Sequence, residues 1–241
     1  MANTIALVTG ANRGIGYEIV RQLAKQGLTV LLGARDMDKG GAAALRLANQ
    51  GLPVTAKHID IANYESVRRL AEDVNTEFGR LDVLVNNAAA YVDWTETASI
   101  ADLRAARQVL ETNLFGTWQC IQTFLPLIRN SSQGRIVNVS SGAGSYSDSQ
   151  FGLTTNQGTA ASYGISKAAV NALTAKLATE LAGTNILVNA VCPGLTATAP
   201  GMEAMGARPV EAGAASIVWA ATLAADGPSG GFFRDGQPLR W

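Results

Sequence analysis

Short apolar runs alternate with segments of helical periodicity along almost the whole chain. The apolar runs are typical of buried strands, and they lie at residues 5–8, 29–32, 54–59, 83–85, 136–139 and 186–191, with a short last strand near 231–233. Between them, apolar residues recur every three to four positions. This periodicity predicts helices near residues 14–26, 38–49, 65–78, 101–125, 163–181 and 209–225.

Strands that alternate with helices at this spacing predict an α/β fold. We expect one Rossmann-type, doubly wound parallel sheet with helices on both faces, in a single domain over residues 1–241. Two segments lack any period, at residues 142–161 and 195–208. Long irregular segments in a compact domain are often functional, so we expect these two to be substrate loops. Ligands of such a sheet bind beyond the carboxyl ends of its strands.

Composition narrows the classes of partner. The 19 basic and 19 acidic residues balance to a formal net charge of +0, which argues against nucleic acid or an anionic membrane as the main partner. No apolar run approaches the ~18 residues of a membrane span. The first strand begins so early that it leaves no room for a signal peptide, so we expect a cytoplasmic protein.

The cysteines and the histidine give no sign of a metal site. Cys120 and Cys192 lack CxxC or metal-ligand spacing, and we interpret them as reduced core residues. His58 ends an apolar run without a second ligand type nearby, so we interpret it as structural. The sequence therefore predicts no metal.

A glycine-rich turn directly follows the first apolar run, Thr9-Gly10-Ala11-Asn12-Arg13-Gly14-Ile15-Gly16. A strand that breaks into such a turn and then a helix offers unpaired N–H groups and a favourable dipole to a pyrophosphate. Gly10 would allow the tight turn, Gly14 a close approach of backbone to phosphate, and Gly16 close packing of helix on strand. The spacing is G-x-x-x-G-x-G rather than the dinucleotide fingerprint G-x-G-x-x-G. An ordinary strand–turn–helix is the alternative interpretation.

Four further motifs follow strands or lie on the next helix: Asn86-Asn87-Ala88-Ala89, Asn138-Val139-Ser140-Ser141, Tyr163-Gly164-Ile165-Ser166-Lys167 and Pro193-Gly194. Together with the glycine loop and in this order, they resemble the short-chain dehydrogenase/reductase family over essentially the whole chain. The tail, with Gly230-Gly231-Phe232-Phe233-Arg234-Asp235-Gly236, Pro238 and Trp241, is similar to that of carbonyl reductase-type members.

The end of the second strand indicates which nicotinamide cofactor binds. An acid at this place binds the ribose 2′-hydroxyl, whereas an arginine accommodates a 2′-phosphate. Here Ala34 takes the acid position and Arg35 follows it, and Arg13 would close on the same phosphate. By resemblance this arginine pair marks NADP(H)-preferring members. In the alternative, Arg35 is a solvated loop cation and Asp36 binds the ribose.

The resemblance also implies roles for residues elsewhere in the cofactor site. Asp60 would hydrogen-bond the adenine amine, Asn87 and its neighbours would border the adenosine, and Thr198 matches a threonine near the nicotinamide carboxamide. The cofactor-binding set that follows is Gly10, Asn12, Arg13, Gly14, Ile15, Gly16, Arg35, Asp60, Ile61, Asn87, Ala88, Tyr163, Lys167, Pro193, Gly194, Thr196 and Thr198.

Carbonyl reduction needs a hydride donor, a proton donor and support for charge on oxygen. Lys167 lies one helical turn beyond Tyr163, where its cation would favour the phenolate and pull the tyrosine pKa down toward working pH. By resemblance Tyr163 donates the proton, and Lys167 also holds the nicotinamide ribose. Ser141, with Ser140 as the alternative, would bind the carbonyl oxygen. Asn113 matches the family asparagine that positions a water in the proton relay.

The sequence thus predicts NADPH-dependent reduction of aldehyde or ketone carbonyls in a small-molecule substrate. The alternatives are a 3-oxoacyl thioester reductase and an NADP-binding sensor or scaffold without turnover. By resemblance we also expect a homodimer or a dimer of dimers, formed through the helices near 101–125 and 163–181. Four small residues on the second helix would allow close approach: Ala168, Ala169, Ala172 and Ala175.

Overall fold

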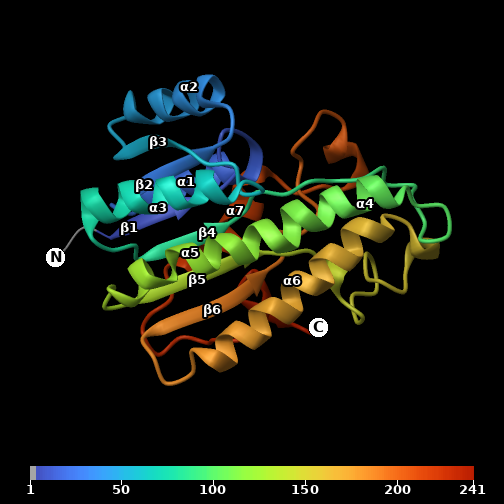
Figure 1. Cartoon of the computed structure of the whole chain (residues 1–241). Coiled ribbons are helices and arrows are strands. Elements are labelled where there is room, and N and C mark those ends of the chain that lie inside the picture. The colour runs from blue at the N-terminus through green and yellow to red at the C-terminus, as the bar shows by residue number, and fades with distance from the viewer. Residues whose placement is uncertain (1–3) are drawn as a thin grey trace.

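A single eight-stranded sheet forms the centre of the computed structural model, which describes residues 4–241 (Figure 1). The first three residues of the predicted domain lie outside the described part. The strands are β1 (Ile5–Val8), β2 (Thr29–Ala34), β3 (Val54–His58), β4 (Val83–Asn86), β5 (Gly134–Val139), β6 (Ile186–Val191), β7 (Phe232–Arg234) and β8 (Gln237–Leu239). Their order in the sheet is β3-β2-β1-β4-β5-β6-β7-β8, and the order reverses beside β1, between β1 and β4.

Helices cover both faces of the sheet. They are α1 (Gly14–Lys25), α2 (Met37–Ala48), α3 (Tyr64–Phe78), α4 (Leu103–Leu110), α5 (Thr117–Arg129), α6 (Ala161–Glu180) and α7 (Val210–Ala221). Figure 1 shows α3, α5 and α6 side by side in front of the sheet, and α1, α2 and α7 pack on the other face. Strand residues alternate between the two cores, with Ala6 and Val8 in one and Ile5 and Leu7 in the other. The predicted doubly wound α/β fold is confirmed.

One helix differs from the prediction over residues 101–125. It begins at Leu103 and runs to Arg129, with a π-helical segment, η1 (Glu111–Gly116), between α4 and α5. Pro126 lies inside α5 and does not end it, because the following Leu127 and Ile128 are buried in the core. The helix predicted over 209–225 ends earlier, at Ala221.

The last strand, β8, was not predicted, and it makes the sheet mixed rather than wholly parallel. It pairs antiparallel with β7 through the two-residue turn Asp235-Gly236. Both turn residues have positive φ, 53° and 74°, as a type I′ hairpin turn requires. Asp-Gly between two strands is a known hairpin signal, so this strand was visible in the sequence.

Three connections gather at the carboxyl ends of the strands, on the right in Figure 1. They are residues 87–102, after β4, and the two irregular segments 142–161 and 195–208. The irregular segments contain only short 3-10 turns, η2 (Gly142–Gly144), η3 (Asn156–Gly158) and η4 (Met202–Met205). The predicted loops therefore lie at the edge of the sheet where the motifs converge.

Candidate active site

Tyr163 and Lys167 lie one turn apart in the first half of α6, and both are buried. The Lys167 Nζ donates to the backbone oxygen of Val139 at 2.8 Å, at the end of β5, and lies 5.6 Å from the centre of the Tyr163 ring. This contact fixes the helix against the strand that carries the serine motif. The Y-x-x-x-K pair is thus part of the sheet edge rather than an exposed surface pair.

The N-terminus of α6 is held by an acid from a distant segment. The Glu96 carboxylate accepts from the backbone N–H of Ser162 at 2.8 Å and from its hydroxyl at 3.0 Å. A negative charge there satisfies free N–H groups and favours the helix dipole. Glu96 was not among the predicted residues, because no local pattern links positions 66 residues apart.

The two serines after β5 have different surroundings. The Ser140 hydroxyl is buried and donates to Asn171 Oδ1 at 2.6 Å, inside the packing between β5 and α6. Ser141 is only partly buried; its oxygen accepts from the Ala143 N–H at 3.2 Å and it hydrogen-bonds Tyr163. The geometry therefore favours Ser141 over Ser140 as the group beside the reacting oxygen.

Burial changes the ionisation of this pair. Loss of solvent raises the pKa of Tyr163 well above its ordinary value, the neighbouring Tyr91 adds to this, and the hydrogen bond with Ser141 opposes it. Burial also lowers the pKa of Lys167 to about 8. The tyrosine shift is opposite to the sequence expectation, since desolvation of the phenol dominates and the lysine ammonium is itself disfavoured by burial. Tyr163 is therefore a protonated phenol at neutral pH.

Asn113 lies in the π-helical segment η1, and its amide forms three hydrogen bonds. Its Oδ1 accepts from the Ala90 N–H at 2.7 Å, and its Nδ2 donates to the Ala90 oxygen at 3.0 Å and to Ser166 Oγ at 2.9 Å. Both amide hydrogens are thereby used, and the side chain ties the segment after β4 to α6. The expected part of Asn113 in holding a water stays a prediction.

The glycine loop between β1 and α1 packs directly on the segment after β4. Gly10 has φ +64°, and a Cβ there would lie 2.7 Å from the Ala88 Cα. A Cβ on Gly16 would lie 2.5 Å from Asn87 Nδ2. That same amide donates to the backbone oxygens of Thr9 and Gly10 at 2.9 and 3.1 Å. The Asn87 amide therefore holds the loop, and the expectation that Asn87 borders the adenosine stays a prediction.

The first turn of α1 has no side-chain cap. Arg13 occupies the N-cap position with extended backbone and is exposed, and no residue caps the helix with a side-chain hydrogen bond. Ile15 packs its side chain against the core, and Asn12 is half-buried. Free N–H groups at such a terminus suit a phosphate, so the loop fits a dinucleotide.

A backbone hydrogen bond brings together the two segments that carry Arg13 and Arg35. The Ala11 N–H donates to the Gly33 oxygen at 2.9 Å. Each arginine follows one of the two bonded residues by two positions, and both arginines are exposed. Within residues 4–241, neither forms an ion pair with a carboxylate. The Asp36 carboxylate caps α2, accepting from the Lys39 N–H at 3.1 Å, and pairs with its ammonium at 2.7 Å. This disfavours the alternative in which Asp36 binds the ribose.

The connection after β3 is fixed by its own contacts. Asp60 Oδ1 accepts from the Ala62 N–H at 3.1 Å, and the Ile61 oxygen accepts from Gln119 at 3.2 Å. The nearby His58 contacts Ser66 Oγ at 3.3 Å. Asp60 thus keeps its carboxylate within a turn at the sheet edge.

Two threonines after β6 were both predicted to bind the cofactor, but their surroundings differ. The Thr196 hydroxyl is buried and donates back to the Gly194 oxygen at 3.1 Å. Thr198 is exposed and lies close to Gly14. A Cβ placed on Gly14 would lie 3.6 Å from the Thr198 methyl carbon. The Thr196 hydroxyl thus supports its own loop, and a contact of this residue with the cofactor stays a prediction, whereas Thr198 lies over the glycine loop.

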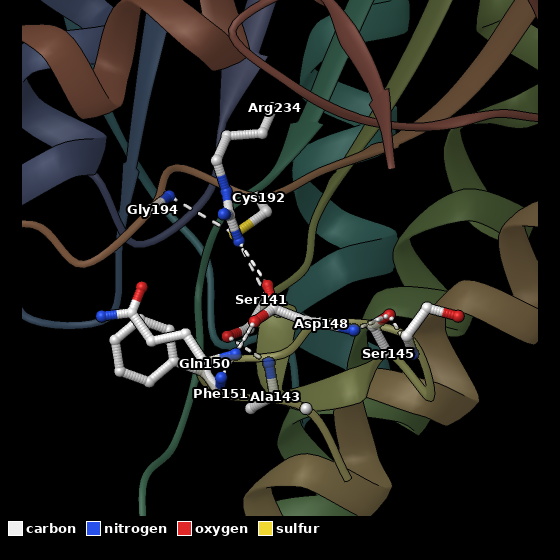
Figure 2. A network of polar contacts seen from close by, with 12 residues as sticks. Ser141, Ala143, Ser145, Asp148, Gln150, Phe151, Cys192, Gly194 and Arg234 are labelled. Atoms are coloured by element: carbon white, nitrogen blue, oxygen red, sulfur yellow. Dashed lines mark hydrogen bonds and ion pairs between the residues drawn. The ribbon is translucent and has the colours of Figure 1, made fainter. Parts of the chain in front are cut away.

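Cys192 is the centre of a polar network shown in Figure 2. Its sulfur accepts from the N–H groups of Gly142 at 3.2 Å and Gly194 at 3.3 Å and from the Arg234 guanidinium at 3.2 Å. Arg234 also pairs with Asp148 at 2.8 Å. The network joins the turn after Ser141 to β7 and the segment 142–161. Cys192 is free and buried as predicted, but its partners lie too far away in the chain for a sequence pattern to reveal.

Among residues 4–241, no helix is both long and apolar enough to cross a bilayer. Within the same residues, no group of three or more His, Cys, Asp and Glu side chains could hold a metal ion.

Comparisons with known proteins agree with this geometry. The family model described as short chain dehydrogenase matches residues 4–207. Carbonyl reductase (NADPH) 1 of Sus scrofa is 35% identical over 276 aligned residues, which cover 98% of this chain and 94% of that protein. The structure of NADPH-bound carbonyl reductase from chicken fatty liver has a TM-score of 0.86 at 26% identity and covers both chains fully. The rhamnolipids biosynthesis 3-oxoacyl-acyl-carrier-protein reductase of Pseudomonas aeruginosa is 35% identical over 198 residues, 80% of this chain and 73% of that protein.

Proposed function

The chain belongs to the short-chain dehydrogenase/reductase family, and from that premise we propose that it reduces aldehydes or ketones to alcohols with NADPH. The single observation that carries the proposal is the buried Tyr163 at the sheet edge, one helical turn before a buried Lys167 that is bonded to the end of β5. A neutral phenol in that place is a proton donor for a carbonyl oxygen. The cofactor is NADP(H), in keeping with the relatives named for NADPH and with the arginine pair beside the glycine loop.

Each residue of the site has a distinct part in the proposed reaction. When bound, the reduced nicotinamide supplies a hydride to the carbonyl carbon. Ser141 hydrogen-bonds the carbonyl oxygen and stabilises its developing charge, and Tyr163 gives that oxygen its proton. Lys167 holds α6 to β5 and would bind the nicotinamide ribose. Asn113 positions the segment after β4 against α6.

The cofactor would lie along the edge formed by β1, β2 and β4. The uncapped turn of α1, with Gly14 and Gly16, would bind the pyrophosphate, and Arg13 and Arg35 the 2′-phosphate. Asp60 with Ile61 and Ala88 would border the adenosine. Pro193, Gly194 and Thr198 would border the nicotinamide end.

The activity is tested by NADPH consumption with a panel of aldehydes, ketones and a 3-oxoacyl thioester. We expect turnover of the aldehydes and ketones, with the thioester slower. The thioester belongs in the panel because a relative of 35% identity is named as a 3-oxoacyl reductase. Turnover of the thioester alone would replace our proposal with that activity. NADPH binding without turnover of any compound would indicate a sensor or scaffold.

We also propose a homodimer, or a dimer of such dimers, formed by α4–α5 and α6 against their two-fold mates. Large apolar side chains are exposed there: Phe115 and Trp118 line a groove on η1 and α5, and Ile165 is exposed on α6. Segment 142–161 runs to the start of α6 and is bridged at Thr159 to Thr97. Figure 1 shows the outer faces of α5 and α6 clear of it. Self-complementary faces of this kind favour closed symmetric assemblies.

Substitution of Trp118 tests this assembly. We expect light scattering at micromolar concentration to give a dimer or tetramer mass, and Trp118→Glu to give a species near 25.1 kDa, because a charge would be buried in the interface. Tyr146→Glu is the matched control, since Tyr146 is exposed elsewhere. A wild-type mass near 25.1 kDa would contradict the proposal.

We further propose that residues 1–241 act as one domain in the cytoplasm. The single sheet supports the first part. Cys120 and Cys192, both free and buried, support a reducing compartment.

A further inference from the structure

Two exposed aromatic side chains pack on the proposed proton donor. The Tyr91 ring stacks on Tyr163 with centroids 5.2 Å apart and an interplanar angle of 21°. The Trp94 ring meets the Tyr163 ring edge-on, with centroids 5.4 Å apart. It is tilted against the Tyr91 ring, with centroids 5.8 Å apart. Tyr91 and Trp94 remain 60% and 58% exposed, whereas Tyr163 is 7% exposed. The two rings therefore form an exposed aromatic surface directly beside the buried Tyr163.

The segment that carries the two rings, residues 90–96, is fixed at both ends, and we name it the aromatic strap. At its start, Ala90 exchanges two hydrogen bonds with the Asn113 amide. At its end, Glu96 binds Ser162 at the N-terminus of α6. Both anchors belong to the elements that place Tyr163. The rings are thus held relative to the reacting hydroxyl by the catalytic framework itself.

The acidic side chains of the strap form hydrogen bonds with nearby backbone and hydroxyl groups. Asp93 Oδ1 accepts from the N–H and the hydroxyl of Thr95 at 2.8 and 2.7 Å. The two oxygens of Glu96 are both bonded to Ser162. The Glu96 carboxylate is thereby used at the N-terminus of α6, whereas Asp93 remains an exposed charge on the strap. The contacts of the strap with Tyr163 itself come from the two uncharged rings.

We propose that Tyr91 and Trp94 determine the specificity of the proposed reductase by selecting carbonyl compounds with an aromatic ring next to the reacting carbon. The inference rests on the proposed reduction and adds its substrate class. Aromatic pairs prefer offset or edge-on arrangements and gain energy beyond the area they bury. A planar ring can extend the Tyr163–Tyr91–Trp94 cluster, whereas a saturated ring of equal size cannot stack in this way.

Paired ketones separate stacking from simple hydrophobic contact. Acetophenone and cyclohexyl methyl ketone have the same carbon skeleton, and 2-butanone lacks the ring. Intrinsic reactivity differs between them, so the quantity measured is the change in the ratio of kcat/KM values between wild type and variant. Purified full-length protein with NADPH is used throughout, and thermal unfolding confirms that each variant is folded.

We expect Tyr91→Leu and Trp94→Leu each to lower the acetophenone to cyclohexyl methyl ketone ratio about 3- to 10-fold, mainly through KM. Tyr91→Phe and Trp94→Phe keep a ring and should retain the ratio, and 2-butanone turnover should change little in all four. An equal loss on all three ketones in the Leu variants would overturn the inference, leaving the strap a structural role and the proposed reductase intact. If wild-type protein reduced none of the ketones, the proposed function and this inference would both fall.

Discussion

Replacement of Tyr163 by Phe should lower the turnover of carbonyl compounds by at least ~10²–10⁴-fold, the loss expected when a general acid is removed. Burial raises the pKa of Tyr163, so the wild-type hydroxyl carries its proton at neutral pH and can give it to the substrate oxygen. Phe keeps the ring that packs against Tyr91 and Trp94, and only the hydroxyl is lost. NADPH affinity should therefore change little. The measurement is single-substrate kinetics together with an NADPH titration.

Tyr91→Phe is the matched control for this experiment. It removes a hydroxyl from the ring stacked on Tyr163, at a residue to which the mechanism gives no proton transfer. Its turnover should remain near that of the wild type. If Tyr163→Phe kept near wild-type turnover with its fold intact, Tyr163 would not be the proton donor.

Local spacing was enough to predict the parts of the site that lie on one element. Tyr163 and Lys167 are one turn apart on a helix whose periodicity is plain, and the glycine loop directly follows an apolar run. The order of strands and helices predicted the sheet for the same reason. Even the missed strand β8 had a local signal in Asp235-Gly236.

Contacts between distant segments could not be predicted in this way. Whether Ser140 or Ser141 faces the site depends on Asn171, which binds Ser140 from α6. The amide of Asn113 is used by Ala90, 23 residues earlier. Thr196 turns its hydroxyl into its own loop, and no pattern distinguishes that from a contact with a ligand.

The ionisation of Tyr163 is a further property that the sequence left open. The Y-x-x-x-K spacing suggested a cation that lowers the tyrosine pKa. In the fold, burial of the phenol has the larger effect, and its sign is opposite. The lysine is also buried, with a pKa of about 8, and its ammonium is directed to the Val139 oxygen. Desolvation depends on tertiary packing, so spacing alone does not predict its size.

Arg35→Asp should weaken NADPH binding about ten- to a hundred-fold while leaving NADH binding nearly unchanged. The substitution removes a charge-assisted contact worth ~1.5–3 kcal/mol and adds a negative charge beside the 2′-phosphate. Asp36 is adjacent and already ionised in its pair with Lys39, so the new carboxylate would increase a local negative potential. NADH lacks the 2′-phosphate and should not be affected by that potential to the same degree.

Arg129→Asp makes the same change of charge at a different place and serves as the control. Arg129 is exposed in the last turn of α5, where the chain leads into the amino end of β5, opposite to the edge that carries the glycine loop. Dissociation constants for NADPH and NADH, measured at two salt concentrations, separate a direct phosphate contact from a general effect of net charge. Equal weakening of both cofactors by Arg35→Asp would show that Arg35 supports the loop rather than the phosphate. Selective weakening of NADPH by Arg35→Asp, but not by Arg129→Asp, would place the 2′-phosphate at the end of β2, because the Arg35 guanidinium has no carboxylate partner within residues 4–241 and lies beside the glycine loop.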